Sequence, residues 1–174
     1  FQTSRLVLSC PLPQSLELLK NSDIPHPLSL EEIKYAKAIV FLIKDEINQQ
    51  PLEAYREVGS SGVFSVASQF KKGTSPLPAW TVTMTPSWSE QHFEKSDTEL
   101  IASARDKIIT QLPYVPLDQI TVKKWRYSHP LTTFKNQFLE IQSGLYLMGD
   151  AFGGPSLNGA HRSAHALLKH FENL

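Results

Sequence analysis

The chain has 174 residues, 41% of them hydrophobic, which is enough to bury the core of one domain or slightly more. Its 17 basic and 17 acidic residues cancel, so the charge balance gives no reason to expect nucleic acid or an anionic membrane as a partner. The single cysteine, Cys10, excludes an internal disulfide and suits a reducing compartment, so we expect a cytoplasmic protein.

The first quarter of the chain predicts two strands with helices between them. Arg5 to Ser9 is predicted as a short strand, and Pro13 to Lys20 as a helix with proline near its first turn. Asparagine, serine, aspartate and two prolines between Asn21 and Pro27 indicate a crossing between domains. Ser29 is predicted to cap a brief helix, and Tyr35 to Asp45 follows as a long strand.

The middle of the chain predicts an antiparallel pair of strands followed by two helices. After a polar loop, Val63 to Phe70 and Ala79 to Thr85 are predicted as strands joined by a loop. Ser87-Trp-Ser-Glu90 has the pattern of a capping box that opens a helix to about Lys95. Asp97 is predicted to cap a second helix, which ends before Pro113 and has an apolar stripe suited to packing on a sheet. The stripe consists of Leu100, Ile101, Ala104, Ile108 and Leu112.

The last third predicts three strands and a closing helix. The strands are Ile120 to Tyr127, Phe138 to Gln142 and Leu145 to Gly149, and the helix is Leu157 to Phe171. Together the elements predict an α+β fold, in which an antiparallel sheet carries helices on one face and is bracketed by two pieces of another domain. The predicted apolar stripe of the closing helix is Leu157, Ala160, Ala164, Leu167, Leu168 and Phe171.

The segment from Gly144 to Ala164 carries the most specific pattern in the sequence. A predicted buried strand ends in Gly149-Asp150, a loop of small residues follows, and a helix begins near Leu157. This order offers one carboxylate and the free N–H groups of a helix N-terminus to the same ligand. A carboxylate at a strand end suits sugar hydroxyls, and a helix N-terminus stabilises an anionic or electron-rich group. A cap or turn carboxylate is the structural alternative for Asp150.

Two segments resemble a known family. Lys124-Trp-Arg-Tyr-Ser-His129 and the segment Gly144 to Ala164, in that order and spacing, resemble the C-terminal part of the renalases, within the flavin-dependent amine oxidase superfamily. The opening Arg5 to Gln14 is similar to a strand and Pro-x-Pro-Gln turn in the middle of the same proteins. The resemblance implies FAD-binding pieces at 1–24 and 123–174 around a substrate-binding domain at 25–122.

The phosphate-binding glycine loop of a dinucleotide fold is absent from the sequence. Such a fold needs G-x-G-x-x-G between a strand and a helix, and no such pattern occurs. Gly59-Ser-Ser-Gly62 leads into a strand-like run instead of a helix. We therefore expect a C-terminal fragment of a larger flavoprotein, with an incomplete Rossmann-like FAD-binding domain. Without its N-terminal dinucleotide-binding half, the fragment is expected to be inactive by itself.

The resemblance implies an oxidoreductase in which FAD accepts a hydride from a small donor, of dihydronicotinamide or amine type, and is reoxidised by O2. Hydride transfer needs placement of the donor, a dry pocket and charge stabilisation, so no catalytic side chain and no metal are expected. The cofactor contacts carried over from the family are Gly149, Asp150, Leu157, Asn158 and Gly159, with Ser9, Cys10 and Pro11 as weaker candidates.

Three residues are candidates for substrate contact. Neighbours on a strand face opposite ways, and we favour Arg126 as the residue that lines the pocket or orients an acidic substrate group, with Tyr127 beside it. The alternative for Trp125 and Arg126 is one side chain in the core and one reaching outward. Trp80 could form the floor of a pocket for a flat aromatic substrate. Core packing is the more ordinary role for it and for Trp88, Phe64 and Phe70.

Other readings of the sequence stay open. His161 and His165 share a helix face, but no third ligand is placed nearby, so a solvated face is favoured over a metal site. His129 is interpreted as a loop histidine, and Cys10 as an inert thiol. A rival class of function is a non-catalytic module that binds a ligand or partner and cannot hold FAD alone. A carotenoid-type or true amine oxidase is less favoured, because no aromatic cage is evident.

Overall fold

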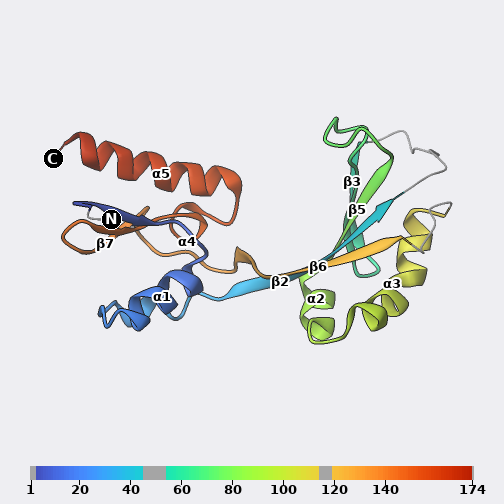
Figure 1. The fold of residues 1–174 in the computed structure, drawn as a ribbon, viewed down its shortest axis with the longest axis horizontal. Coiled ribbons are helices and arrows are strands. Elements are labelled where there is room, and N and C mark those ends of the chain that lie inside the picture. Colours follow the sequence, from blue (N-terminus) through green and yellow to red (C-terminus); the bar gives the residue numbers. More distant parts are fainter. Residues whose placement is uncertain (1–2, 45–53, 114–118, 174) are drawn as a thin grey trace. The chain divides into compact units, whose positions relative to one another are not determined.

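The computed structural model describes residues 3–44, 54–113 and 119–173, which form two compact units (Figure 1). The first unit contains the chain up to Ala36 and from Tyr127 onward, and the second runs from Lys37 to Arg126. The chain passes between the units along β2 (Tyr35–Lys44) and β6 (Ile120–Pro130). Asp45, predicted as the end of the first long strand, lies outside the described residues.

The second unit is built on a five-stranded sheet with the order β3-β4-β5-β2-β6. The pairings of β3 with β4, β4 with β5 and β5 with β2 are antiparallel, as predicted for the β4–β5 pair. The new strands are β3 (Tyr55–Ser60), β4 (Val63–Ser68) and β5 (Ala79–Met84). The prediction of a polar loop was wrong for β3, an edge strand whose described side chains are mostly exposed.

Two helices pack on this sheet, and the N-cap of each lies one or two residues before the predicted cap. The N-cap of α2 (Pro86–His92) is Thr85, whose side chain accepts the N–H of Trp88, so the predicted capping box at Ser87 was wrong. The N-cap of α3 (Asp97–Gln111) is Ser96 instead of Asp97. Ser96 and Glu99 form a complete capping box, which stabilises the first turn.

One hydrophobic core joins the two helices to the sheet. Leu100, Ala104 and Ile108 of α3 are fully buried, which confirms the predicted stripe. Trp80 and Trp88 belong to the same core. The core prediction was wrong for Phe64 and Phe70, which are exposed: Phe64 alternates with Val63 across the sheet, and Phe70 lies beyond the end of β4.

The first unit contains a small mixed sheet with the order β1-β8-β7. β1 (Leu6–Leu8) and β8 (Leu145–Leu147) are parallel, and β7 (Leu139–Gln142) is antiparallel to β8. Figure 1 shows α1 (Leu12–Asn21) and α5 (Leu157–Glu172) on opposite sides of these strands. All three residues of β8 are buried, as predicted for this strand.

The segment predicted as a domain crossing, 21–27, lies within the first unit and is mostly exposed, although Ile24 packs against the core. The short 3-10 helix η1 (Leu28–Leu30) and the following Ile33 place two buried side chains, Leu30 and Ile33, against α1 and β8 residues. The cap predicted at Ser29 was wrong, because η1 begins after Pro27 and has no side-chain cap. The expected boundaries at 24/25 and 122/123 therefore lie earlier in the chain than the boundaries of the compact units.

The buried face of α5 differs from its predicted stripe. Leu157 and Leu168 are 87% and 53% exposed, whereas Gly159, Ser163 and Leu167 are buried. The reason is a close helix contact: a Cβ on Gly159 would lie 2.0 Å from the carbonyl oxygen of Gly154. This contact turns the small residues inward and the two leucines outward.

The fold is therefore α+β, with a five-stranded sheet that carries helices in one unit and a small mixed sheet in the other. Within the described residues, no helix is both long and apolar enough to cross a membrane.

Candidate functional site

A cavity of about 380 Å³ lies in the first unit, beside the ends of β1 and β8 and the start of α5. Because β1 and β8 are parallel, the segments that follow them leave the sheet at the same edge. The predicted carboxylate and the predicted helix start thus face a common space. The residues that line the cavity are Ser9, Pro11, Ser128, His129, Gly149, Asp150, Pro155, Ser156, Leu157 and Ala160.

Gly149 forms the sharp turn out of β8. Its φ of 130° lies in a region that favours glycine. Its N–H donates a 2.9 Å hydrogen bond to the Oγ of Ser163, and this hydroxyl donates in turn to the carbonyl oxygen of Gln137 at 2.6 Å. Ser163 has no exposed surface. The turn before Asp150 is therefore held from the α5 side by one buried serine.

Asp150 begins a short helix that the sequence did not predict, α4 (Asp150–Gly153). Its Oδ1 accepts a 2.7 Å hydrogen bond from the hydroxyl of Tyr35, and that hydroxyl accepts the N–H of Leu12 at 3.3 Å. Burial raises the pKa of Tyr35 far above its usual range, and the contact with Asp150 raises it further, while the Leu12 N–H opposes the shift. Tyr35 therefore stays neutral and donates to the carboxylate at physiological pH.

This hydrogen bond occupies one oxygen of the Asp150 carboxylate and leaves the other available to a ligand. Oδ2 of Asp150 forms no hydrogen bond with any residue that the structure describes, and Asp150 is only half-buried in the cavity wall. A carboxylate fixed through one oxygen presents the other in a defined direction. Such a group can accept a hydrogen bond from a hydroxyl of a bound molecule.

The first turn of α5 supplies the donors. Ser156 is the N-cap, and its Oγ accepts the N–H of Gly159 at 3.0 Å. The N–H groups of Leu157 and Asn158 have no acceptor among residues 3–44, 54–113 and 119–173. A ligand at this helix start can therefore meet two backbone donors, but the predicted donor Gly159 is already engaged by the cap.

A close contact of α4 with α5 fixes where these donors lie. A Cβ on Gly153 would lie 1.8 Å from the carbonyl oxygen of Gly159, so neither glycine has room for a side chain. The Nη2 of Arg162 donates to the carbonyl oxygen of Gly153 at 2.7 Å. The two helices are thus tied by backbone contact and by one charged hydrogen bond.

The remaining cofactor candidates lie at the edge of the site. Ser9 and Pro11 line the cavity, whereas Cys10 does not. The Sγ of Cys10 is 3.1 Å from the Oγ of Ser15, a buried residue of α1. Asn158 and Gly159 are not among the lining residues either.

Arg126 and Tyr127 do not line this cavity. Arg126 is exposed and its guanidinium lies over the ring of Phe93, 5.1 Å from the centroid, in the second unit. Tyr127 packs edge-on against Tyr35 in the first unit, with 5.9 Å between ring centroids. Trp125 is 59% exposed and Arg126 is exposed too, so the alternative in which one of the two lies in the core does not hold.

The histidine predictions had mixed outcomes. His129 lies in β6 and not in a loop, and it lines the cavity beside Ser128. His161 and His165 are exposed and stack on each other with 6.2 Å between centroids. Within the described parts of the chain, no group of three potential ligands could hold a metal ion.

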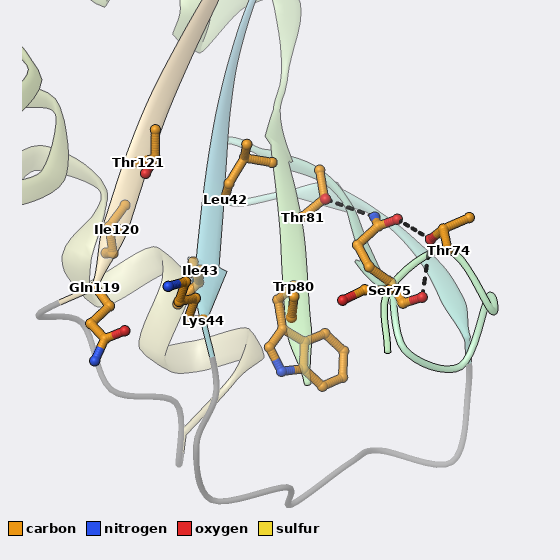
Figure 2. Close-up of a pocket in the computed structure, with 12 residues that line it drawn as sticks. Leu42, Ile43, Lys44, Thr74, Ser75, Trp80, Thr81, Gln119, Ile120 and Thr121 are labelled. Atoms are coloured by element: carbon orange, nitrogen blue, oxygen red, sulfur yellow. Dashed lines mark hydrogen bonds between the residues drawn. The ribbon is translucent and has the colours of Figure 1, made fainter. Parts of the chain in front are cut away.

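A second cavity, of about 550 Å³, lies at one end of the sheet in the second unit (Figure 2). Trp80, predicted as a substrate contact, is among the lining residues, but it is only 1% exposed and belongs mainly to the core. The Nε2 of Gln69 donates to the hydroxyl of Thr81 at 2.7 Å, and Thr74 donates to Oε1 of Gln69 at 2.8 Å. Gln69, Thr74 and Thr81 in the wall of this cavity are therefore already hydrogen-bonded to one another.

The fold matches solved oxidoreductases at low sequence identity. A candidate protoporphyrinogen oxidase from Exiguobacterium sp. 255-15 aligns with 97% of the chain, with a TM-score of 0.72 and 16% identity. An FAD-dependent oxidoreductase from Pseudomonas aeruginosa aligns with 98% at a TM-score of 0.60 and 18% identity. An oxidoreductase from Methanosarcina mazei aligns with 97% at a TM-score of 0.57 and 12% identity.

The chain shares its fold with part of an FAD-dependent oxidoreductase. It spans 41%, 45% and 43% of the three matched chains, less than half of each. No protein-family description matches the sequence, and no curated protein matches it. The likeness therefore establishes the fold, and renalase identity in particular is not shown by it.

The residues around the first cavity fit one end of FAD. A volume of about 380 Å³ is within the range of small-molecule sites but is small for a whole dinucleotide. One oriented carboxylate oxygen and the free N–H of Leu157 match the hydroxyls of a ribityl chain and the electron-rich edge of a flavin ring. The sequence has no glycine loop for the diphosphate.

Proposed function

We propose that this chain forms the part of a flavin-dependent oxidoreductase that holds the ribityl and isoalloxazine end of FAD. The observation that carries the proposal is the cavity at which Asp150 and the first turn of α5 meet the end of β1. The fold shared with part of an FAD-dependent oxidoreductase supports it independently.

The chain's own residues would bind and orient the cofactor. Oδ2 of Asp150 accepts a hydrogen bond from a ribityl hydroxyl, while Tyr35 holds Oδ1. The N–H groups of Leu157 and Asn158 point their partial positive charge at the flavin, where it stabilises the negative charge that reduction creates. Pro11, Pro155 and Leu157 contribute apolar wall that excludes water.

FAD held here would supply hydride chemistry: a small dihydronicotinamide-type or amine donor would give up two electrons with one proton, and O2 would accept both electrons, that proton and a second proton from water to become hydrogen peroxide. The resemblance of 124–129 and 144–164 to the renalases supports this choice of donor and acceptor. No side chain of this chain acts as acid or base in the proposal. Placement of the donor over the ring and exclusion of water are sufficient for hydride transfer.

The diphosphate and adenosine would be bound by residues that this sequence does not contain. The missing G-x-G-x-x-G loop and the coverage of less than half of each matched chain support a dinucleotide-binding half as the partner of this segment.

The test is FAD retention by the whole protein that contains this segment. Asp150→Asn removes the charge while an amide oxygen can still accept from Tyr35. Losing a charged hydrogen bond costs about 1.5–3 kcal/mol, so we expect the Kd for FAD to rise about tenfold or more. Asp106→Asn, on an exposed position of α3 in the second unit, is the matched control. Visible flavin absorbance after desalting and a titration of the apoprotein measure the change.

Two results would overturn the proposal. One is a whole protein that retains no flavin, and the other is an Asp150→Asn variant that binds FAD as tightly as Asp106→Asn does. Retention of FAD by the 174-residue chain alone would contradict the view that half of the site lies elsewhere.

The second candidate function is a non-catalytic binding module. It is favoured by the larger cavity of the second unit, which is lined by Trp80, Leu42 and Lys44 and does not involve the flavin-site residues (Figure 2). A whole protein without flavin that binds a small apolar ligand, and loses it in a Leu42→Asp variant, would establish this function in place of the first.

A further inference from the structure

Three cationic side chains surround one aromatic ring in the second unit. The ring is that of Phe93, which follows α2 and is 5% exposed. The Nζ of Lys37 lies 5.0 Å from its centroid, the guanidinium carbon of Arg126 5.1 Å and the Nζ of Lys124 5.9 Å. Lys37 comes from β2 and the other two from β6, so all belong to the same unit. We call Lys37, Lys124 and Arg126 the cation cluster.

The positive charge of the cluster is only partly balanced. Glu90 pairs with Lys37 at 2.9 Å between Oε1 and Nζ. Among residues 3–44, 54–113 and 119–173, no carboxylate lies within ion-pair distance of Lys124 or Arg126. Charges gathered around one ring lie close together on the scale of the Debye length, about 8 Å at physiological salt, so they repel one another. An anion placed among them would remove that repulsion.

The cluster is held in place before any ligand arrives. The face of an aromatic ring attracts cations, and each member of the cluster uses the ring of Phe93 in this way. Lys124 also donates to the carbonyl oxygen of Lys95, which orients its ammonium group. Arg126 donates no hydrogen bond to any described residue, so its fork of donors is available.

We propose that the cation cluster binds a phosphate group. Arginine presents paired donors that match phosphate oxygens. A lysine ammonium group adds positive charge and does not need a fixed orientation toward the phosphate. The two cations without an ion pair among the described residues, Lys124 and Arg126, match the charge of a phosphate dianion, whereas a monocarboxylate would compensate only one of them. The proposal goes beyond the flavin site and does not depend on it, because none of its residues lines the first cavity.

The test is calorimetric titration of the whole protein with inorganic phosphate and with phenyl phosphate at low salt. We expect saturable binding that weakens as ionic strength rises. Arg126→Gln should weaken it about tenfold, and Arg126→Lys should weaken it less, because the charge remains. Lys123→Gln is the matched control: Lys123 is exposed, neighbours Lys124 on β6 and points to the other face of the sheet.

A second measurement covers the case in which Arg126→Gln unfolds more easily. Phosphate should raise the Tm of the wild-type and Lys123→Gln proteins and leave the Tm of Arg126→Gln unchanged. Tighter binding of phenyl phosphate than of inorganic phosphate would support a phosphate ester as the natural ligand, and equal binding would support free phosphate. The proposal is overturned by equal binding in Arg126→Gln and Lys123→Gln, or by citrate binding as tightly as phosphate.

Discussion

The contact between α4 and α5 predicts that adding one methyl group to Gly159 destabilises the protein, against the ordinary preference of helices. In an exposed helix interior, changing glycine to alanine gains about 1 kcal/mol. At Gly159 the new Cβ would lie 2.0 Å from the carbonyl oxygen of Gly154, 2.6 Å from its carbonyl carbon and 2.8 Å from its Cα. All three atoms are backbone, so α5 must shift relative to α4. Overpacking of this kind costs about 1–3 kcal/mol, which we take as the expected loss for Gly159→Ala.

Thermal and urea unfolding of the whole protein would measure this loss. We expect the urea midpoint and the Tm both to fall, with a loss in the free energy of unfolding of about 1–3 kcal/mol. Asn158→Ala is the matched control, because the side chain of Asn158 is exposed and forms no hydrogen bond with the described residues. It should change stability by no more than about 0.5 kcal/mol. A Gly159→Ala protein as stable as the control would refute the packing argument and the inward rotation of α5 that rests on it.

Two further changes test the supports of Asp150. Tyr35→Phe leaves the half-buried carboxylate of Asp150 and the buried N–H of Leu12 without the hydroxyl, which should cost about 1–3 kcal/mol in urea unfolding; a loss below about 0.5 kcal/mol would contradict it. The pKa of Tyr35 is raised in the folded state, so its contribution to the free energy of unfolding is complete below the unfolded pKa of about 10 and is lost as the pH rises further. The Tyr35→Phe variant should not show this loss of stability at alkaline pH. Ser163→Ala removes two hydrogen bonds inside the protein and should cost at least as much; Ser103→Ala, on half-buried α3 surface, is its control.

Local patterns were sufficient wherever a single element determined the outcome. The long helix α3 has a regular apolar stripe, and β8 is an unbroken apolar run, so both were predicted close to their actual limits, although the cap of α3 is Ser96 and not Asp97. The turn at Gly149-Asp150 was predicted for the same reason, since the strand and the glycine are adjacent in the sequence.

Prediction from the sequence failed where a residue distant along the chain determines the local structure. β3 has few apolar residues because it pairs with β4 at the edge of a sheet and needs little burial. The stripe of α5 was predicted from hydrophobicity, but a backbone contact with α4 selects the glycine face. Tyr35 was missed as a site residue because its partner, Asp150, lies 115 positions away.

The residues that would contact a flavin and the residues that hold them are different sets, and this separation makes the function testable. Asp150 and the Leu157 N–H face the cavity, whereas Tyr35 and Ser163 fix their positions from behind. Asp150→Asn should therefore weaken FAD binding while stability is retained, because the amide oxygen still accepts from Tyr35. Ser163→Ala should lower stability and binding together. If both variants lowered stability equally and neither changed flavin binding, the cavity would be a feature of packing, and the FAD site would have to be sought elsewhere.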